Sequence, residues 1–238
     1  MSIKSQIDRI ATNISNVYWM LEQIGITLPD VRNSDNLPQA VSELADTSSG
    51  KILDGSISGP YSNSKVTKLK NSAFAYCASV QSVSLPNCAT LEYRCFYRAT
   101  TLSEVNLRNV TAITGQGVFS VAGIESLYLP KLVTLSDASN MCNSCSRLTK
   151  AVFPALSGQT IPGTCFAYCS VLKTLVLGGS KLNPLSATNA LTDTLIAKGG
   201  GYIYVPRDLV SSYKSATNWS TFANQIRAIE DYPEVLGG

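Results

Sequence analysis

The cysteines are the residues of this sequence with the most obvious capacity for chemistry. Seven are present, with two residues between Cys142 and Cys145 and three between Cys165 and Cys169. Pairs this close are typical of zinc sites and of disulfide frameworks. A structural zinc site needs four convergent ligands, however, and the sequence holds no histidine to supply any of them. We therefore expect no metal site and no cofactor.

Candidate catalytic groups are isolated from the partners that they would need. The serines have no histidine to act as a general base, and nothing marks a serine–lysine pair. Glu104 and Glu125 lie about one repeat apart, but acids on a polar strand face are ordinary solvating groups, whereas a glycosidase needs two acids across a cleft. Gly199–Gly201 lacks the Lys-Ser/Thr pair that follows in a phosphate-binding loop. We expect no catalytic residues, and a glycan-active enzyme is the least favoured alternative.

The composition bears on partners in two ways. The 238 residues are 45% hydrophobic and 15% charged, and the net charge of +3 comes from scattered lysines and arginines. Such a charge gives no electrostatic case for nucleic acid. No stretch reaches the ~18 apolar residues of a membrane span. Charges interleave with the first isoleucines, so we expect neither a signal peptide nor membrane insertion.

A repeat of 22 to 24 residues organises the middle of the chain. Ala73-Phe74-Ala75-Tyr76-Cys77 reappears as Cys165-Phe166-Ala167-Tyr168-Cys169, and the spacing lies within the leucine-rich-repeat range of ~20–29 residues. Aligning outward predicts three buried columns, each with one residue per repeat: Phe74, Phe96, Val118, Cys142 and Phe166; Cys77, Ala99, Val121, Cys145 and Cys169; and Val80, Leu102, Ile124, Leu148 and Leu172. Because no single turn can bury its own apolar face, we expect the repeats to stack into a solenoid.

Each repeat also carries one short alternating segment, which predicts one strand per repeat. These segments are Val83-x-Leu85, Val105-x-Leu107, Leu127-x-Leu129, Ala151-x-Phe153 and Leu175-x-Leu177. Proline follows three of them and ends the strand, because it cannot donate to a ladder. Ile203-x-Val205 is expected to form a last strand, reached through an insert at 181–201. The residues expected to begin the non-strand part of each repeat are Leu69, Leu91, Ile113, Leu135 and Ile161.

The repeat register accounts for the cysteines. Every cysteine occupies a position where a repeat needs a small buried apolar residue, a role that a free cysteine fills well. We therefore expect structural free thiols, which suit a reducing folding compartment.

The fold class that these patterns predict is an α/β repeat solenoid, a leucine-rich-repeat stack with one short strand per repeat and helices at its ends. The expected domains are an N-terminal helical attachment module at 1–46, a linker and cap at 47–65, the solenoid at 66–206, and a capping helix and tail at 207–238. Ile52 and Ile57 are expected to cap the first coil. Asp208 is expected to cap the C-terminal helix, whose apolar stripe, with a break near Asn218, would be Leu209, Tyr213, Phe222, Ile226 and Ile229.

The N-terminal segment contains a heptad pattern. Its apolar residues follow one another at alternating steps of four and three: Ile3, Ile7, Ile10, Ile14, Val17, Leu21 and Ile24. A strict period of 3.5 with β-branched residues at both seam positions favours a trimeric coiled coil. A helix that packs its stripe on the solenoid would tolerate the same pattern, so both arrangements stay open.

The repeats resemble the BspA-like, or treponemal-type, leucine-rich repeats through the pattern AF-x-x-C-x-x-(V/L)-x-x-(V/L)-x-LP. The resemblance implies a right-handed curved solenoid with a strand-lined face that serves in adhesion or partner binding. Val118 and Cys142 depart from the pattern, where they replace its phenylalanine. The N-terminal segment resembles the short N-terminal module of phage and prophage tail-associated proteins. The segment at 203–226 resembles a C-terminal module that often follows such repeats in gut bacterial and prophage proteins. Together these resemblances imply a virion accessory protein that attaches through its N-terminus.

Two surface strips are candidates for binding. The residues between the apolar strand positions and their neighbours should point outward, and the expected ligand-binding set is Asn106, Tyr128, Lys150, Val152, Val176 and Tyr204. A second strip on the turns would contain Tyr76, Tyr97, Arg98 and Tyr168. Exposed aromatic residues favour binding surfaces. The alternative is that both strips are solvated faces with scattered tyrosines.

The function expected from all of this is non-enzymatic binding. We expect a phage or prophage tail-associated protein, located in the virion after assembly in the bacterial cytoplasm, that displays its repeats as a homotrimer. Its partners would be a host-surface protein or glycan and, through the N-terminal segment, other tail proteins. The alternative is a bacterial cell-surface adhesion protein of the same repeat family, which would need a secretion signal and an anchor.

Overall fold

A computed structural model of the chain describes Tyr18 and residues 59–237. Apart from Tyr18, which is helical and buried, the module at 1–46 lies outside the described residues. The heptad seam from Ile3 to Ile24 and the expected cap at Ile52 and Ile57 also lie outside them.

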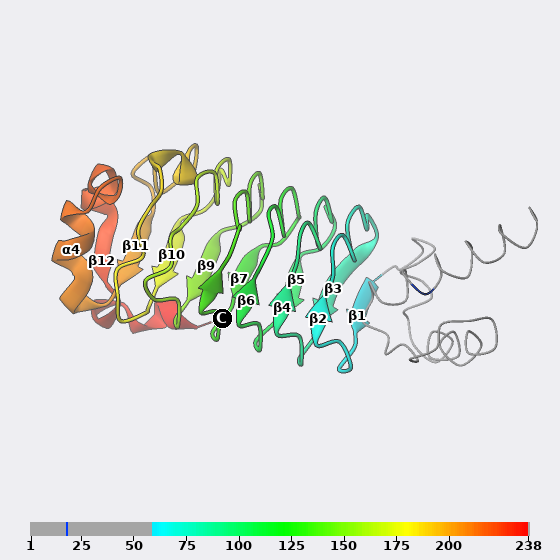
Figure 1. Cartoon of the computed structure of the whole chain (residues 1–238). Coiled ribbons are helices and arrows are strands. Elements are labelled where there is room, and N and C mark those ends of the chain that lie inside the picture. Colours follow the sequence, from blue (N-terminus) through cyan, green and yellow to red (C-terminus); the bar gives the residue numbers. More distant parts are fainter. Residues whose placement is uncertain (1–17, 19–58, 238) are drawn as a thin grey trace, which may run out of the picture.

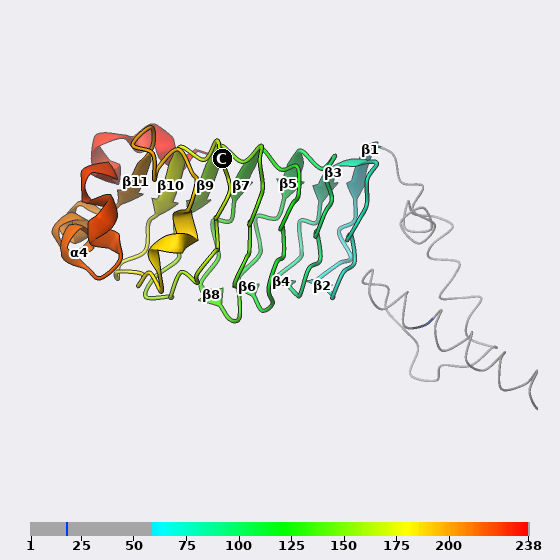
Figure 2. The same cartoon turned by 90° about the horizontal axis from the view of Figure 1, so that it is seen from above.

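Two stacks of short parallel strands run along the described residues (Figure 1), and Figure 2 shows that they lie on opposite sides of the coils. The longer strands form a three-stranded group and a five-stranded group, β1–β3–β5 and β7–β9–β10–β11–β12. Their bounds are β1 Gly59–Ser62, β3 Val80–Ser84, β5 Glu104–Asn106, β7 Ser126–Tyr128, β9 Lys150–Phe153, β10 Thr174–Leu177, β11 Tyr202–Val205 and β12 Ile226–Ala228. The second stack is a four-stranded sheet of β2 Lys68–Leu69, β4 Thr90–Leu91, β6 Ala112–Ile113 and β8 Thr134–Leu135.

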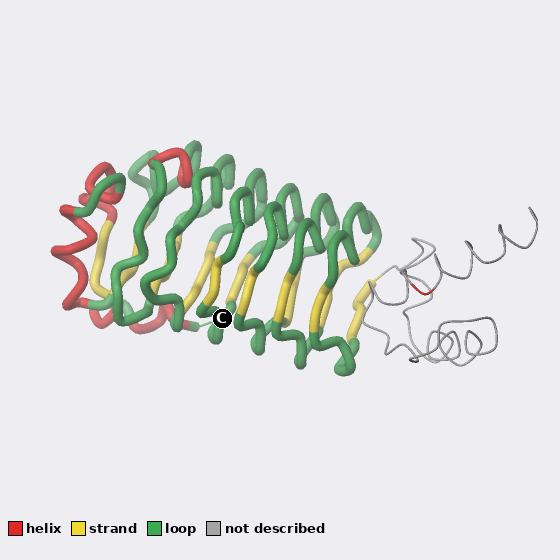
Figure 3. The backbone as a smooth tube through the Cα atoms, viewed as in Figure 1, coloured by secondary structure: helices red, strands yellow, loops and turns green. Residues whose placement is uncertain are grey.

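The predicted strands are confirmed, and their register follows the repeat. Val83 is opposite Val105, Ala151 is opposite both Leu127 and Leu175, and Leu175 is opposite Ile203. Each residue therefore lies beside its counterpart in the next coil. As the tube in Figure 3 shows, turns make up most of each coil between the strands.

The second strand stack corrects one prediction. Leu69, Leu91, Ile113 and Leu135 were expected to begin non-strand segments, but each is the second residue of a two-residue parallel strand. Coils that pack at about 4.8 Å bring every straight backbone run within hydrogen-bonding distance of the next coil. A two-residue strand is too short to show an alternating pattern, so the periodicity reveals only the longer strands.

The segment at 181–201 is a further coil of the stack. Leu185 bridges Ile161 in parallel, the Phe166 amide donates to the Ala190 carbonyl at 2.9 Å, and the Ile196 amide donates to the Leu172 carbonyl at 3.2 Å. The expectation of an insert here is wrong. The coil lacks the aromatic and cysteine residues of the repeat pattern, and it contains the short 3-10 helix η1, Thr188–Leu191.

The C-terminal cap is a compound structure, where the sequence predicted a helix with a break near Asn218, and the break is confirmed. It comprises η2 Arg207–Leu209, α4 Val210–Ser215, η3 Trp219–Gln225 and β12, with η2 and η3 in 3-10 conformation. The helix ends at Ala216 in extended conformation, and Asn218 adopts a φ of 66°. Asp208 makes no capping hydrogen bond. Ile226 belongs to β12, which pairs with β11 and adds another strand to the solenoid.

The cap nevertheless closes the core. Tyr213 and Trp219 are fully buried, with ring centroids 5.4 Å apart. The Trp219 indole N–H donates to the Asn183 carbonyl at 2.7 Å, and the Asn183 amide N–H donates to the Tyr213 hydroxyl at 2.9 Å. The two rings therefore cover the last coil and satisfy its polar groups, and Figure 2 shows α4 at this end of the stack.

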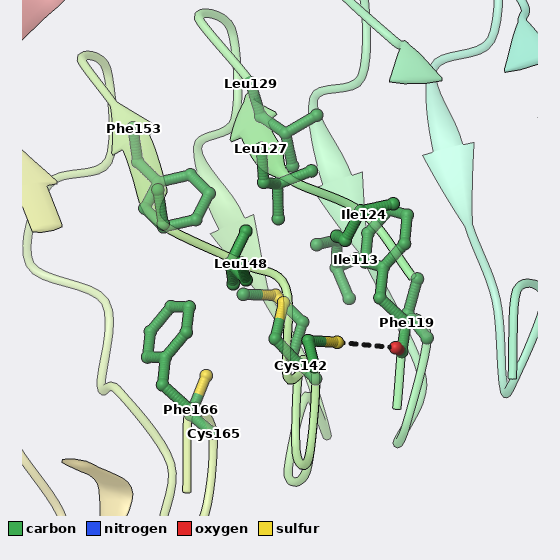
Figure 4. Packing of buried hydrophobic residues seen from close by; sticks show 14 of the residues in the cluster. Ile113, Phe119, Ile124, Leu127, Leu129, Cys142, Leu148, Phe153, Cys165 and Phe166 are labelled. Carbon is green, nitrogen blue, oxygen red and sulfur yellow. Dashed lines mark hydrogen bonds between the residues drawn. The ribbon is translucent and has the colours of Figure 1, made fainter. Parts of the chain in front are cut away.

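The phenylalanine column runs through Phe119, and the prediction that Val118 occupies it is wrong. Phe74, Phe96 and Phe119 stack with centroid separations of 5.3 and 5.1 Å. Ala122 likewise replaces Val121 in the cysteine column, because Ala122 is buried and Val121 has a φ of 62° at the turn surface. The third repeat therefore keeps its phenylalanine, and Figure 4 shows Phe119 beside Ile113 and Ile124.

This shift leaves one residue fewer between Ala122 and Ile124, and Gly123 closes the gap. Its amide donates to the Ala99 carbonyl at 3.0 Å. A Cβ on Gly123 would lie 2.1 Å from the Thr100 carbonyl oxygen. Only glycine lets the backbones of the two coils approach this closely.

We predict that Gly123→Ala destabilises the solenoid by about 1–3 kcal/mol, because the added carbon forces the two backbones apart. Gly200→Ala is the matched control. Its added Cβ would lie no closer than 3.6 Å to any neighbour, so its effect should stay within about 0.5 kcal/mol. Thermal unfolding followed by circular dichroism measures both. Equal melting temperatures for the two variants would contradict the close approach at Gly123.

Candidate binding surfaces

The cysteines lie in the core, as the repeat register predicted. All seven are free thiols, and all except the partly buried Cys77 are buried. The Cys145 thiol donates to the Phe119 carbonyl at 2.9 Å, and the Cys169 thiol donates to the Cys142 carbonyl at 2.9 Å. Burial raises the pKa of Cys142 to about 11. A thiol with so high a pKa stays protonated near neutral pH, which suits a packing role and disfavours a nucleophile.

The outer strip is the row of side chains on the longer strands that points away from the core. The strand register places its members side by side within each group, in the order Ser62, Ser84 and Asn106 in the three-stranded group and Tyr128, Val152, Val176, Tyr204 and Arg227 in the five-stranded group. The sequence therefore predicted correctly which residues share this row.

The C-terminal half of the outer strip is covered, and the expectation that it is exposed is wrong. Val152 is 1% exposed, Val176 0% and Tyr204 7%. The segment with the two 3-10 helices η4, Ile229–Asp231, and η5, Pro233–Leu236, lies over these residues. Figure 2 shows this segment in red across β11 and β10, with the chain end beside β9.

The contacts beneath this C-terminal segment are mainly apolar. Ile229 and Val235 form one buried cluster with the covered strip residues, and the Tyr232 ring lies 5.4 Å from the Tyr204 ring. The Lys150 ammonium donates to the Gly237 carbonyl. Burial, with Tyr232 and Glu234 nearby, raises the pKa of Tyr204.

The sequence contains a pattern that indicates that these strands are covered on their outer face. The strands of the covered half read KAVF, TLVL and YIYV, which are nearly continuous apolar runs, whereas β5 and β7 read EVN and SLY. A continuous apolar run is typical of a strand that is buried on both faces. Alternation between inward and outward positions alone therefore does not reveal the second buried face.

The open half of the outer strip contains a small hollow, which we call the Asn106–Tyr128 hollow. Its volume is about 220 Å³, and it is lined by Glu104, Val105, Asn106, Arg108, Ser126 and Tyr128. It lies between β5 and β7, where the three-stranded and five-stranded groups meet. Two of the six expected ligand-binding residues, Asn106 and Tyr128, therefore meet here. Lys150 lies at the boundary of the covered half.

One lining residue of the hollow, Asn106, carries a buried polar atom that lacks a partner among the described residues. The Asn106 amide donates to the Ser84 hydroxyl at 3.2 Å, but its Oδ1 oxygen is buried and accepts no hydrogen bond there. The Arg108 guanidinium lies over the Tyr128 ring, 5.5 Å from its centroid. The hydrogen-bond acceptor of Asn106, the aromatic ring of Tyr128 and the cation of Arg108 thus lie on two adjacent coils.

The residues of the second predicted strip do not all lie together in the structure. Tyr76, Tyr97 and Arg98 lie together on the turns of the first coils, with the rings of Tyr76 and Tyr97 5.4 Å apart. Tyr168 is exposed on the corresponding turn three coils beyond Arg98. The structure adds two residues that sequence reasoning missed, since Arg94 lies over the rings of both Tyr93 and Tyr97.

We predict that Val235→Asp releases the C-terminal segment. The segment loses the roughly 1.5–3 kcal/mol that burial of a valine supplies, so the covered strip becomes exposed and the binding of an apolar dye such as anilinonaphthalene sulfonate rises. Leu236→Asp is the control, because Leu236 is already 37% exposed. Equal dye binding by the two variants would show that Val235 does not hold the segment in place.

Comparison with known proteins identifies the repeats. The model of the BspA type leucine-rich repeat region matches residues 56–180 in six copies, and no curated protein matches the chain. In the described residues no helix is long and apolar enough to cross a membrane. The match supports a surface-interaction or adhesion protein, in agreement with exposed strips on a stacked core. The chain belongs to the BspA-type leucine-rich repeat family.

Proposed function

We propose that this protein is a non-enzymatic attachment protein of a phage or prophage tail, and that it binds a component of the host surface through the Asn106–Tyr128 hollow. The observation that carries the binding role is the unpartnered Oδ1 oxygen of Asn106 beside an aromatic ring. Buried polar atoms in native proteins nearly always have a partner. Because the oxygen is buried, the Asn106 side chain would turn toward the hollow to accept a hydrogen bond from a ligand donor.

The surroundings of the hollow suit a small polar feature of a larger ligand. The Tyr128 ring offers an apolar face, Arg108 and Glu104 offer charges of both signs at the rim, and Ser126 offers a hydroxyl. Binding sites combine an apolar wall with a few convergent polar groups in this way. The C-terminal segment covers the strip beyond Lys150, so ligand access to the outer strip is restricted to the N-terminal coils.

The tail assignment is supported by the ends of the chain. The segment at 1–46 resembles a module of phage and prophage tail-associated proteins, and the segment at 203–226 resembles a module found in gut bacterial and prophage proteins. The heptad from Ile3 to Ile24 is typical of a trimer. Three linked copies would bind a cell surface far more strongly than one, since each later contact forms at a high effective concentration.

A bacterial cell-surface adhesion protein is the second candidate, favoured by the repeat family alone. Gene neighbours separate the two. Tail or baseplate genes beside this gene support attachment to a virion, whereas neighbours that encode cell-envelope proteins support the adhesion protein.

We predict that Asn106→Ala combined with Tyr128→Ala weakens attachment to host cells by about 30-fold or more, because the central residues of an interface often contribute 1 kcal/mol or more each. Labelled protein is titrated onto a panel of bacterial strains by flow cytometry. Tyr168→Ala is the control, since Tyr168 is an exposed tyrosine on a different face. Tyr204 is unsuitable for substitution, because it is buried beneath the C-terminal segment. Undiminished attachment of the double variant would exclude the hollow.

We also predict that the full-length protein is a trimer at micromolar concentration. Light scattering should give three times the 25.4 kDa mass of one chain. Ile10→Asp with Ile14→Asp should give the single-chain mass, because a charge on the seam is not tolerated. Asn13→Asp, outside the seam, should leave the trimer intact. A monomeric wild-type protein would remove the case for trimeric display.

A further inference from the structure

A cluster of tyrosines and arginines lies on the turns of the first coils, away from the outer strip. We call it the tyrosine–arginine ridge, and it consists of Tyr76, Tyr93, Arg94, Tyr97 and Arg98. These residues lie on the long turns that connect β2 to β3 and β4 to β5. Tyr76 is 64% exposed and Tyr93 38%. The exposure of a large aromatic ring to water is energetically unfavourable. Clusters of exposed rings are therefore typical of binding surfaces.

The backbone of these turns holds the ridge in one arrangement. The Tyr76 amide donates to the Tyr97 carbonyl at 2.8 Å, and the Arg98 amide donates to the Ser120 carbonyl at 2.9 Å. These hydrogen bonds between neighbouring coils hold the turns in place. The stacked rings of Phe74 and Phe96 lie in the core beneath the turns. The side chains of the ridge are carried on a rigid support.

Aromatic rings position the two guanidinium groups. Arg94 lies 4.9 Å from the centroid of Tyr93 and 4.7 Å from that of Tyr97, and Arg98 lies 5.6 Å from that of Tyr97. Each such contact restrains the guanidinium group but uses none of its N–H donors, which stay available to a ligand. Both arginines therefore present donors that are oriented in advance.

No carboxylate in the described part of the chain pairs with either arginine, in contrast to two arginines elsewhere on the solenoid. Arg147 pairs with Glu125, and Arg207 pairs with Asp231. The acid nearest in sequence, Glu92, pairs with Lys68 at 2.6 Å. The ridge thus carries two positive charges that its own neighbours do not neutralise.

We propose that the tyrosine–arginine ridge binds an anionic glycan. The guanidinium forks bind carboxylate, sulfate or phosphate groups with paired hydrogen bonds, and the exposed faces of Tyr76 and Tyr93 pack against the C–H faces of sugar rings. The ridge is separate from the Asn106–Tyr128 hollow, so this inference does not depend on the proposed function.

A glycan fits the ridge better than an acidic peptide. A peptide that binds an edge or turn generally does so by adding main-chain hydrogen bonds. The amides of Tyr76, Arg94 and Arg98 already donate to the next coil, so the ridge offers side chains and few main-chain groups. Flat rings beside planar cations suit a polymer that alternates apolar ring faces with charged substituents.

The test measures binding of full-length protein to two charged polymers, polygalacturonate and dextran sulfate, by biolayer interferometry at low salt. Methyl-esterified polygalacturonate and plain dextran are the neutral counterparts, and polyglutamate is the acidic peptide. We expect at least one charged glycan to bind about tenfold or more tighter than its neutral counterpart and than polyglutamate, and salt to weaken it by screening. Equal binding of polyglutamate, or binding of neither charged glycan above its neutral counterpart, overturns the proposal.

Substitutions then locate the site. Arg94→Gln with Arg98→Gln should weaken glycan binding about tenfold or more, and Arg94→Lys with Arg98→Lys should recover little of it, because lysine keeps the charge but lacks the planar fork. Tyr76→Ala should weaken binding about threefold or more through the lost ring face. Arg147→Gln is the control for a surface arginine elsewhere on the solenoid. Full binding by the lysine variant or by Tyr76→Ala overturns the ridge as described.

Two further measurements keep the result unambiguous. The melting temperature of each variant, followed by circular dichroism, must match that of the wild type, so that loss of binding reports the surface and not the fold. The hollow variant, Asn106→Ala with Tyr128→Ala, should bind the charged glycan normally. Its loss of glycan binding would place the site at the hollow and overturn the ridge.

Discussion

The structure depends on one constraint, that the backbone groups of each coil are satisfied by the coils on either side. Two straight runs per coil pair in parallel with their neighbours, and the turns between them donate from one coil to the next. A coil has no independent fold, because its buried polar groups would otherwise lack partners. The last coil therefore needs a different solution. Trp219 and Tyr213 close it with buried rings and hydrogen bonds to Asn183, and β12 extends the outer strand stack by one more strand.

The same constraint explains where the solenoid can vary. Core columns accept phenylalanine or cysteine, as at Phe119, Cys142 and Phe166, because neighbouring coils share the volume between them. The backbone is less tolerant, and the shortened link of the third repeat requires a glycine at 123. Side chains on the open half of the outer strip and on the tyrosine–arginine ridge lie outside the buried columns. Residue types can change there at little cost to stability, and this is where binding surfaces form on repeat proteins.

The C-terminal segment divides the molecule into two functional halves. It covers Val152, Val176 and Tyr204, so the apolar part of the outer strip serves stability. The open surfaces, the Asn106–Tyr128 hollow and the tyrosine–arginine ridge, both lie on the N-terminal coils. They offer different chemistry, since the hollow holds an unpartnered acceptor and the ridge holds two arginines that aromatic rings orient. A single ligand-bearing surface, such as a bacterial envelope, could engage both.

The sequence by itself determined the repeat, the longer strands and the members of the outer strip, because a spacing of 22 to 24 residues brings equivalent positions side by side in any stacked arrangement. It also placed the cysteines in the core. Only the tertiary structure decided the rest. The two-residue strands were invisible to periodicity, Phe119 took the column because its ring stacks on Phe96, and residues 181–201 joined the stack without its usual residues. Above all, the exposure of the outer strip depended on a segment more than twenty residues further along the chain than Tyr204. The pairing of apolar faces depends on segments that are far apart in the sequence, so a local pattern does not reveal it.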